Sequence, residues 1–434
     1  MAKSTLEKLF VSIDILFSGI LVVFFQSGTF KAFGVLFDDL VIAYNTSNIY
    51  AGWIFTFQAS IAYIVAGISA PLLKGFQNRS VGVTGGFLFG LGFVLNGLLG
   101  KTIYQLFVFT GISAVGGGLL YFSLIMTFFE HFDKETFPVA YSVRELFQYL
   151  GITAIPVLLE QLREEYGLSG SYLIMGAIVW NCMISGVLMK PKTPCPQSVH
   201  HDHAHESSES TNRKDESAGP EDKTEETRMG NLLILCSIEP ATRHPIFALY
   251  IMIHSLLSYS FVVWAVFLVP FGKSLGLPSD VAVLLSVCGG IGGLFGKLVV
   301  LFVFWSNRMN SITCSVIPAT ICTVSLSGYI FFQDFWTLAV SSLFCGFSLA
   351  YADCALNGIL PRYVCKVHMR QGVAISYFFS GALMQLGGII SGALLDISGS
   401  FTIIFSIVIF INIASIVLAL GMHKMDGNII ECNE

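Results

Sequence analysis

Uncharged apolar runs of about 20 residues recur along the whole chain, and this feature limits the possible folds more than any other. Inside a bilayer the backbone amides must be hydrogen-bonded within the chain, so runs of this length predict membrane-spanning α-helices. Charged residues make up only 12% of the 434 residues, against roughly 25% in soluble domains. The sequence therefore predicts an all-α membrane protein and excludes a soluble enzyme.

Twelve such runs, bounded by charged residues, Gly, Pro or Asn, fall into two groups of six. The run 139–160 is the least regular, because Arg144 and Glu145 lie inside it. The expected spans are 11–36, 50–72, 80–99, 103–129, 139–160, 170–189, 246–272, 281–304, 312–332, 335–358, 371–394 and 401–421.

Lysine and arginine collect in alternate loops, as the positive-inside rule predicts for a chain with a cytoplasmic N-terminus. The loops expected outside hold only Lys101, Arg163 and Lys273, whereas the segments expected inside hold fourteen such residues. This distribution indicates an even number of spans and two cytoplasmic termini.

A polar segment with almost no apolar residues separates the two groups of spans. Because it cannot bury a core, we predict a disordered cytoplasmic linker. The chain then divides into a six-helix bundle at 1–191, the linker at 192–244, a second six-helix bundle at 245–423 and a tail at 424–434. This is the plan of the major facilitator superfamily, whose two halves enclose a site near the membrane midplane.

Several segments resemble the monocarboxylate transporter family, also called solute carrier family 16. They are GTFKAFGVLF, ISAPLLKGFQNRSVGVTGG and EEYGLSGSYLIMGAIVWNCMISGVLMKP in the first half, then FLVPFGKSLGLPSDVAVLLSV and SGALLDISGSF in the second. The resemblance implies a secondary transporter, by symport, of a small organic solute, a monocarboxylate or related anion, at the plasma membrane. It also implies a single-span immunoglobulin-like glycoprotein as chaperone.

The departures from that family predict a divergent member. The first span opens with KLFVSI instead of the usual acidic residue, glycines and tryptophans, and Gly292 and Gly296 stand where proton-coupled lactate carriers place Asp and Arg. A facilitative carrier of an amino acid, creatine-like or aromatic solute is therefore an alternative. A transport-inactive, receptor-like membrane protein is a weaker one.

Three residues are predicted to contact the substrate. Lys31 matches the family's cavity lysine, and an ammonium within a span is costly unless it faces water, protein or an anion; its alternative is snorkelling to the headgroups. Lys297 lies one position, or about 100° around a helix, from the place of the family's arginine. An interfacial location is its alternative. Tyr351 is the third predicted contact.

Four titratable residues within the spans are candidates for proton coupling or for a gate. Arg144 and Glu145 point in different directions from one helix, so we expect each to have a partner on another helix. Asp353 and His254 are the other candidates, since burial shifts a carboxyl pKa and His titrates near neutrality. The resemblance assigns a conformational role to Arg79 and Asp396.

Four linker histidines, His200, His201, His203 and His205, lie beside carboxylates and offer zinc ligands. Incidental binding is the simpler reading, because the spans lack closely spaced ligands; a metal-ion carrier is a weak alternative. No phosphate-binding loop, nucleophile elbow or metalloprotease pattern is present in the sequence. We therefore expect no enzymatic activity, no cofactor and no nucleic-acid partner, and transport driven by a gradient of substrate or of coupled protons.

Overall fold

The fold is taken from a computed structural model of the chain. The described residues are 12–32, 36, 40, 42–45, 48–72, 75–190, 245–306, 310, 312–364 and 369–425. The predicted linker 192–244, with its four histidines, lies outside this set, as do residues 426–434 of the predicted tail.

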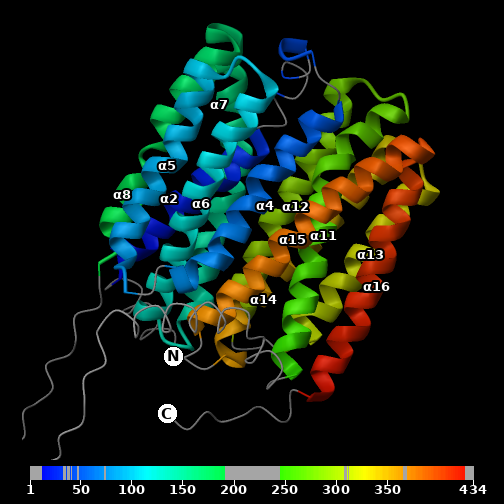
Figure 1. Cartoon of the computed structure of the whole chain (residues 1–434). Helices are drawn as coiled ribbons and strands as arrows, with labels where there is room; N and C mark the ends of the chain where they lie inside the picture. The colour runs from blue at the N-terminus through cyan, green and yellow to red at the C-terminus, as the bar shows by residue number, and fades with distance from the viewer. Residues whose placement is uncertain are drawn as a thin grey trace, which may run out of the picture.

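Every regular element among the described residues is a helix, and the two groups of helices form two halves (Figure 1). The first half contains α2 (Ile13–Ala32), α4 (Asn48–Leu72), α5 (Asn78–Leu99), α6 (Ile103–His131), α7 (Phe137–Val179) and α8 (Cys182–Leu188). The second half contains α11 (Pro245–Ser274), α12 (Ser279–Trp305), the π-helix η1 (Ile312–Val316), α13 (Ile317–Phe331), α14 (Phe335–Tyr363), α15 (Met369–Ser398) and α16 (Phe401–Met425).

These helices confirm the predicted all-α membrane fold. Within the described residues ten helices are long and apolar enough to cross a membrane, and α4 contributes a shorter apolar stretch, Thr56–Ala70. The structural ends of most spans fall within a few residues of the predicted ends. The main difference is α7, which runs through two predicted spans.

The long helix α7 consists of two crossings that meet at Gly167. Its backbone there has φ 67°, a left-handed conformation that interrupts the helix and that glycine adopts without strain. Leu159 and Tyr172 lie on either side of this glycine and line one small cavity together with Phe93 of α5. In one straight helix Leu159 and Tyr172 would be about 20 Å apart. The chain therefore turns back at Gly167, which separates the predicted fifth and sixth spans.

Side-chain caps fix the start of two helices. At α6 the Thr102 hydroxyl accepts a hydrogen bond from the Gln105 amide, and the Gln105 side chain accepts one from the Thr102 amide. At α14 the Asp334 carboxylate accepts from the Thr337 amide at 2.9 Å. Both contacts satisfy backbone donors that a helix start leaves unpaired.

The outer faces of the helices are apolar. Phe302, Val324 and Phe410 are 68%, 69% and 72% exposed, although residues of this kind are normally buried in a soluble protein. A helix that is apolar around its whole circumference fits a lipid surface on one side and a protein core on the other. The exposed faces are accordingly the surface for the bilayer.

The two halves meet along two seams. Helix α4 packs along α15, and α7 packs against α12 and α14. In Figure 1 α4, in blue, and α15, in orange, run next to each other through the middle of the molecule. Within the second half α11 begins and α16 ends at the same end of the molecule, as expected for an even number of crossings.

Candidate functional site

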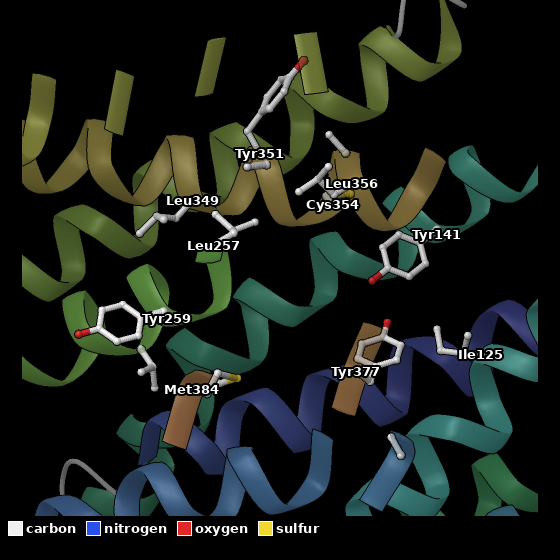
Figure 2. Close-up of a cluster of buried hydrophobic side chains, with 14 of the residues drawn as sticks. Ile125, Tyr141, Leu257, Tyr259, Leu349, Tyr351, Cys354, Leu356, Tyr377 and Met384 are labelled. Atoms are coloured by element: carbon white, nitrogen blue, oxygen red, sulfur yellow. The ribbon is translucent and has the colours of Figure 1, made fainter. Parts of the chain in front are cut away.

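A cavity of about 110 Å³ lies between the two halves, near the middle of the helices. On this measure one water molecule needs about 10–15 Å³, so the cavity has room for several waters or a small solute. Leu257, Leu349 and Met384 form an apolar wall from the second half, seen in Figure 2. The polar lining is Gln26, Ser27, Gln58, Tyr63, Ser113, Tyr121, Glu145, Gln148, Tyr149, Ser258 and Asp353.

Two carboxylates and one ammonium lie together beside this cavity, where the halves meet. Lys297 Nζ of α12 lies 2.8 Å from Glu145 Oε2 of α7 and 2.8 Å from Asp353 Oδ2 of α14. The Lys297 side chain is 1% exposed and that of Glu145 2%, so both charges have been removed from water. Such burial is tolerated only when the charges are paired, and Lys297 is paired twice.

The guanidinium of Arg144 continues this contact on the first half. It pairs with Glu145 Oε1 and donates to the Tyr121 hydroxyl at 3.2 Å. Its carbon Cζ also lies 4.3 Å from the centre of the Tyr141 ring, within the range of a cation–π interaction. The carboxylate of Glu145 is therefore bound by one cation from each half.

Three neutral groups close the contact into a ring. Asn357 Nδ2 donates to Asp353 Oδ1 at 3.1 Å, and the Tyr377 hydroxyl donates to Asn357 Oδ1 at 3.2 Å. The hydroxyls of Tyr377 and Tyr121 lie 3.3 Å apart. We call this set the polar ring; its members are Arg144, Glu145, Lys297, Asp353, Asn357, Tyr377 and Tyr121. It crosses between the halves twice and contains two cations and two anions.

His254 of α11 is attached to the polar ring through Asn357. Its Nε2 lies 3.3 Å from Asn357 Nδ2, and its Nδ1 lies 2.8 Å from the Ser380 hydroxyl and 3.0 Å from that of Ser376. The Asn357 amide nitrogen thus lies between the Asp353 carboxylate and the imidazole of His254.

Several polar groups of the cavity wall have no partner within the described residues. They are the side-chain oxygens Oε1 of Gln26, Gln58 and Gln148 and the Ser113 hydroxyl, all buried. A buried polar oxygen without a hydrogen bond costs about 1–3 kcal/mol. These groups come from α2, α4, α6 and α7, so the unsatisfied hydrogen-bonding capacity of the wall is concentrated in the first half.

Five of the predicted site residues come together in one network. Arg144, Glu145, Lys297 and Asp353 are members of the polar ring, and His254 is bonded to it. We expected partners on other helices for the adjacent pair, and Glu145 has one in Lys297. Arg144 has one in Tyr121, but it also bonds Glu145 itself.

The other predicted residues lie elsewhere. Lys31 is in the last turn of α2, next to Phe30 of the cavity lining, but does not itself line the cavity. Figure 2 shows the Tyr351 ring pointing away from Leu257 and Leu349. Arg79 and Asp396 are exposed near the ends of α5 and α15. The linker histidines are outside the described residues, among which no group of His, Cys, Asp and Glu could hold a metal ion.

Four kinds of site residue were not predicted from the sequence: Tyr121, Asn357, Tyr377 and the cavity glutamines. Two signals were present: Asn357 follows Asp353 by four positions and Gln148 follows Glu145 by three, which places each pair on one helix face. The two tyrosines carry no comparable signal, because Tyr121 of α6 and Tyr377 of α15 meet only in the folded structure.

Comparisons with known proteins agree with this architecture. The family model described as Major Facilitator Superfamily matches residues 19–369. Monocarboxylate transporter 7 of Homo sapiens is 24% identical over 360 residues, covering 74% of this chain and 68% of the relative. Monocarboxylate transporter 4 of Gallus gallus is 23% identical over 424 residues, covering 94% and 82%. These identities are low for such long alignments.

Among solved structures, the superfamily's proton:xylose symporter XylE, bound to 6-bromo-6-deoxy-D-glucose, has a similar fold. The TM-score is 0.70 at 12% identity, and the match covers 95% of each chain. At this identity the likeness concerns the fold alone.

Proposed function

Because the chain belongs to the Major Facilitator Superfamily and is a divergent relative of the monocarboxylate transporters, we propose that it carries a small organic solute by alternating access about the central cavity. The polar ring supports this most directly. It joins the two halves through the ion pair of Lys297 with Glu145, and each half keeps a neutral pair when the halves separate: Arg144 with Glu145 in the first and Lys297 with Asp353 in the second. Enzymatic chemistry is not part of this proposal.

The proposed orientation places both termini in the cytoplasm and the chain in the plasma membrane. The polar ring then lies on the cytoplasmic side of the cavity, because Arg144 and Glu145 belong to the first turns of α7. Two further contacts between the halves lie on this side: Arg370 Nη2 to Asn78 Oδ1 at 3.3 Å, and Cys354 Sγ to the Ser142 hydroxyl at 3.4 Å. We therefore interpret the structure as the state closed toward the cytoplasm.

Within this proposal Asp353 is the group that takes up a coupled proton. Its side chain is 31% exposed, whereas the other three charged members of the polar ring are at most 2% exposed. A proton on Asp353 would weaken its ion pair with Lys297 inside the second half and so change the energy of the neighbouring pair of Lys297 with Glu145, which joins the halves. A single-span immunoglobulin-like glycoprotein remains the proposed chaperone, on the strength of the family resemblance.

Cross-linking tests alternating access directly. In a background without accessible native cysteines, the pair Asn78→Cys and Arg370→Cys joins the two halves, and a short bis-maleimide should abolish uptake into proteoliposomes. The matched control is the pair Asp14→Cys and Lys190→Cys, which replaces an ion pair of 3.1 Å inside the first half. Cross-linking the control should leave uptake unchanged. Equal inhibition of both pairs, or of neither, would contradict the proposal.

The orientation is tested at the two ends of α6. Lys101 precedes this helix, Lys134 follows it, and both are exposed. An impermeant thiol reagent added to intact cells should label Lys101→Cys but label Lys134→Cys only after permeabilisation. The opposite pattern would reverse the proposed topology.

A further inference from the structure

The charges that face the cavity are of one sign. Glu145 and Asp353 line it, whereas their counter-ions Arg144 and Lys297 do not, and no other Lys or Arg among the described residues does. The exposed fractions agree: the Asp353 side chain is 31% exposed and that of Lys297 1%. Although the polar ring is neutral as a whole, its negative ends are directed toward the cavity and its positive ends away from it.

The neutral groups of the wall can adapt to a ligand of either sign. The amide oxygens of Gln26, Gln58 and Gln148 are buried without a donor in the described part of the chain. Rotation about the last side-chain bond exchanges the oxygen and the N–H groups of an amide, so these side chains can turn an acceptor toward a ligand N–H group. The charges of the wall, and not these amides, therefore select against a carboxylate.

Aromatic rings complete the wall. Tyr63, Tyr121, Tyr149, Phe30, Phe89 and Phe261 all line the cavity. The faces of such rings attract cations, most strongly where water is excluded. Carboxylates and aromatic side chains around one cavity form the chemical environment that an organic cation requires.

We propose that the solute recognised in this cavity carries a positively charged nitrogen, an ammonium or a guanidinium, and that simple monocarboxylates are poor ligands. This inference rests on the proposed transport function and specifies its substrate class. It differs from the expectation drawn from the family resemblance, in which Lys31 attracts an anion. Lys31 follows Phe30 at the end of α2 but does not line the cavity, so it does not reverse the sign of the wall.

The test compares ligands that differ only in their charged group. Two series, butylamine with butyramide and butyrate, and benzylamine with benzamide and benzoate, are titrated into purified protein at neutral pH, without any gradient. At least one amine should bind about tenfold tighter than its carboxylate, with the amide between them. Binding of a carboxylate as tightly as the amine, or binding of none of the six, would overturn the inference.

A pair of variants locates the binding. Gln58→Met keeps the approximate size of a cavity residue but removes its amide, and it should weaken amine binding roughly tenfold. Gln385→Met is the matched control: its Oε1 is also buried and unpaired among the described residues, but it does not line the cavity. It should leave amine binding unchanged. Equal losses in both variants would show that the amine binds elsewhere and would also overturn the inference.

Uptake is measured separately, so that the two ideas can fail independently. If the amine binds with the expected selectivity but is never accumulated or exchanged by proteoliposomes, the transport proposal fails and the assignment of the cavity stands. If a carboxylate is transported and the amines are not, transport stands and the assignment of substrate class fails.

Discussion

The two seams between the halves are built differently. Along α4 and α15 the contact is one of shape: Gly67 packs against Phe378, Gly381 against Tyr63 and Gly388 against Thr56. Along α7 and α12 a charged contact, the ion pair of Lys297 with Glu145, is added to the close packing of Gly293 against Tyr149. Small residues allow close helix approach in a membrane, whereas buried charges need specific partners.

This difference indicates that the two seams have separate roles in the movement of the halves. Close packing through glycines is insensitive to pH, to salt and to a ligand in the cavity. The charged seam borders the cavity and includes Asp353, so a proton or a charged solute can change its energy. We therefore expect the glycine seam to set how closely the halves approach and the charged seam to set when they separate.

The largest expected effect comes from Lys297→Met. It leaves Asp353 and Glu145 without their shared cation, and breaking a buried ion pair on one side costs about 3–5 kcal/mol. Thermal unfolding in detergent should show this loss, and transport should be impaired. The double variant Lys297→Met with Asp353→Asn should recover much of the stability, because Glu145 keeps Arg144. Simple additivity of the two losses would argue against the charged seam as described.

The next effect is at the glycine seam. A Cβ atom on Gly381 would lie 2.8 Å from the Ser60 carbonyl oxygen and 2.8 Å from Tyr63 Cβ, so Gly381→Val should overpack the seam and cost about 1–3 kcal/mol. Gly392→Val, on the same helix, is the control, because a Cβ there meets nothing within 4 Å. The loss in Gly381→Val should be independent of pH between 5 and 8. A loss of stability that changes with pH would contradict the proposed difference between the two seams.

A smaller effect is expected from Asp353→Asn. Lys297 keeps Glu145, so folding should persist with a loss of about 1–3 kcal/mol. Wild-type uptake should respond only weakly to an inward proton gradient, since Gly292 and Gly296 hold no proton. Asp353→Asn should alter what response there is. Steep proton-driven accumulation that persists in this variant would contradict the role of Asp353 and would favour Glu145 or His254 as the group that carries the proton.

The smallest expected effect is that of Tyr377→Phe. The variant removes one hydroxyl from the polar ring but keeps the ring contacts with Tyr63 and Tyr121, so the cost should be about 0.5–1.5 kcal/mol. Tyr259→Phe serves as control: the Tyr259 hydroxyl points away from Tyr377 in Figure 2. Tyr377→Phe should lower the transport rate and the unfolding temperature more than Tyr259→Phe does. Identical behaviour would mean that the tyrosine link contributes nothing.

The fold could be predicted from the sequence because the bilayer imposes a length and a polarity on each span. The two crossings within α7 were predicted as separate spans, because a run of charges near Arg163 interrupts the apolar pattern before Gly167. Such signals are local. They depend on neighbouring residues in the chain and not on which helices later become neighbours.

The pairing of the site could not be predicted in the same way. The cost of a buried charge predicted that Arg144 and Glu145 would need partners, but Glu145 and Lys297 are 152 positions apart and belong to different halves. Their contact depends on how α7 and α12 meet. The family resemblance directed attention to Lys297 as a substrate contact, whereas the structure places Asp353 nearer the cavity and Lys297 behind it.

The balance of charges in the polar ring has an electrical consequence. With two cations and two anions, the ring can be rearranged within the membrane field without moving net charge, so the protein itself adds little to a transport current. A current would then report the charge of the cargo and of any coupled ion. Moving one elementary charge through 100 mV is worth about 2.3 kcal/mol, so an inside-negative membrane potential alone would concentrate a univalent organic cation roughly fiftyfold at 100 mV.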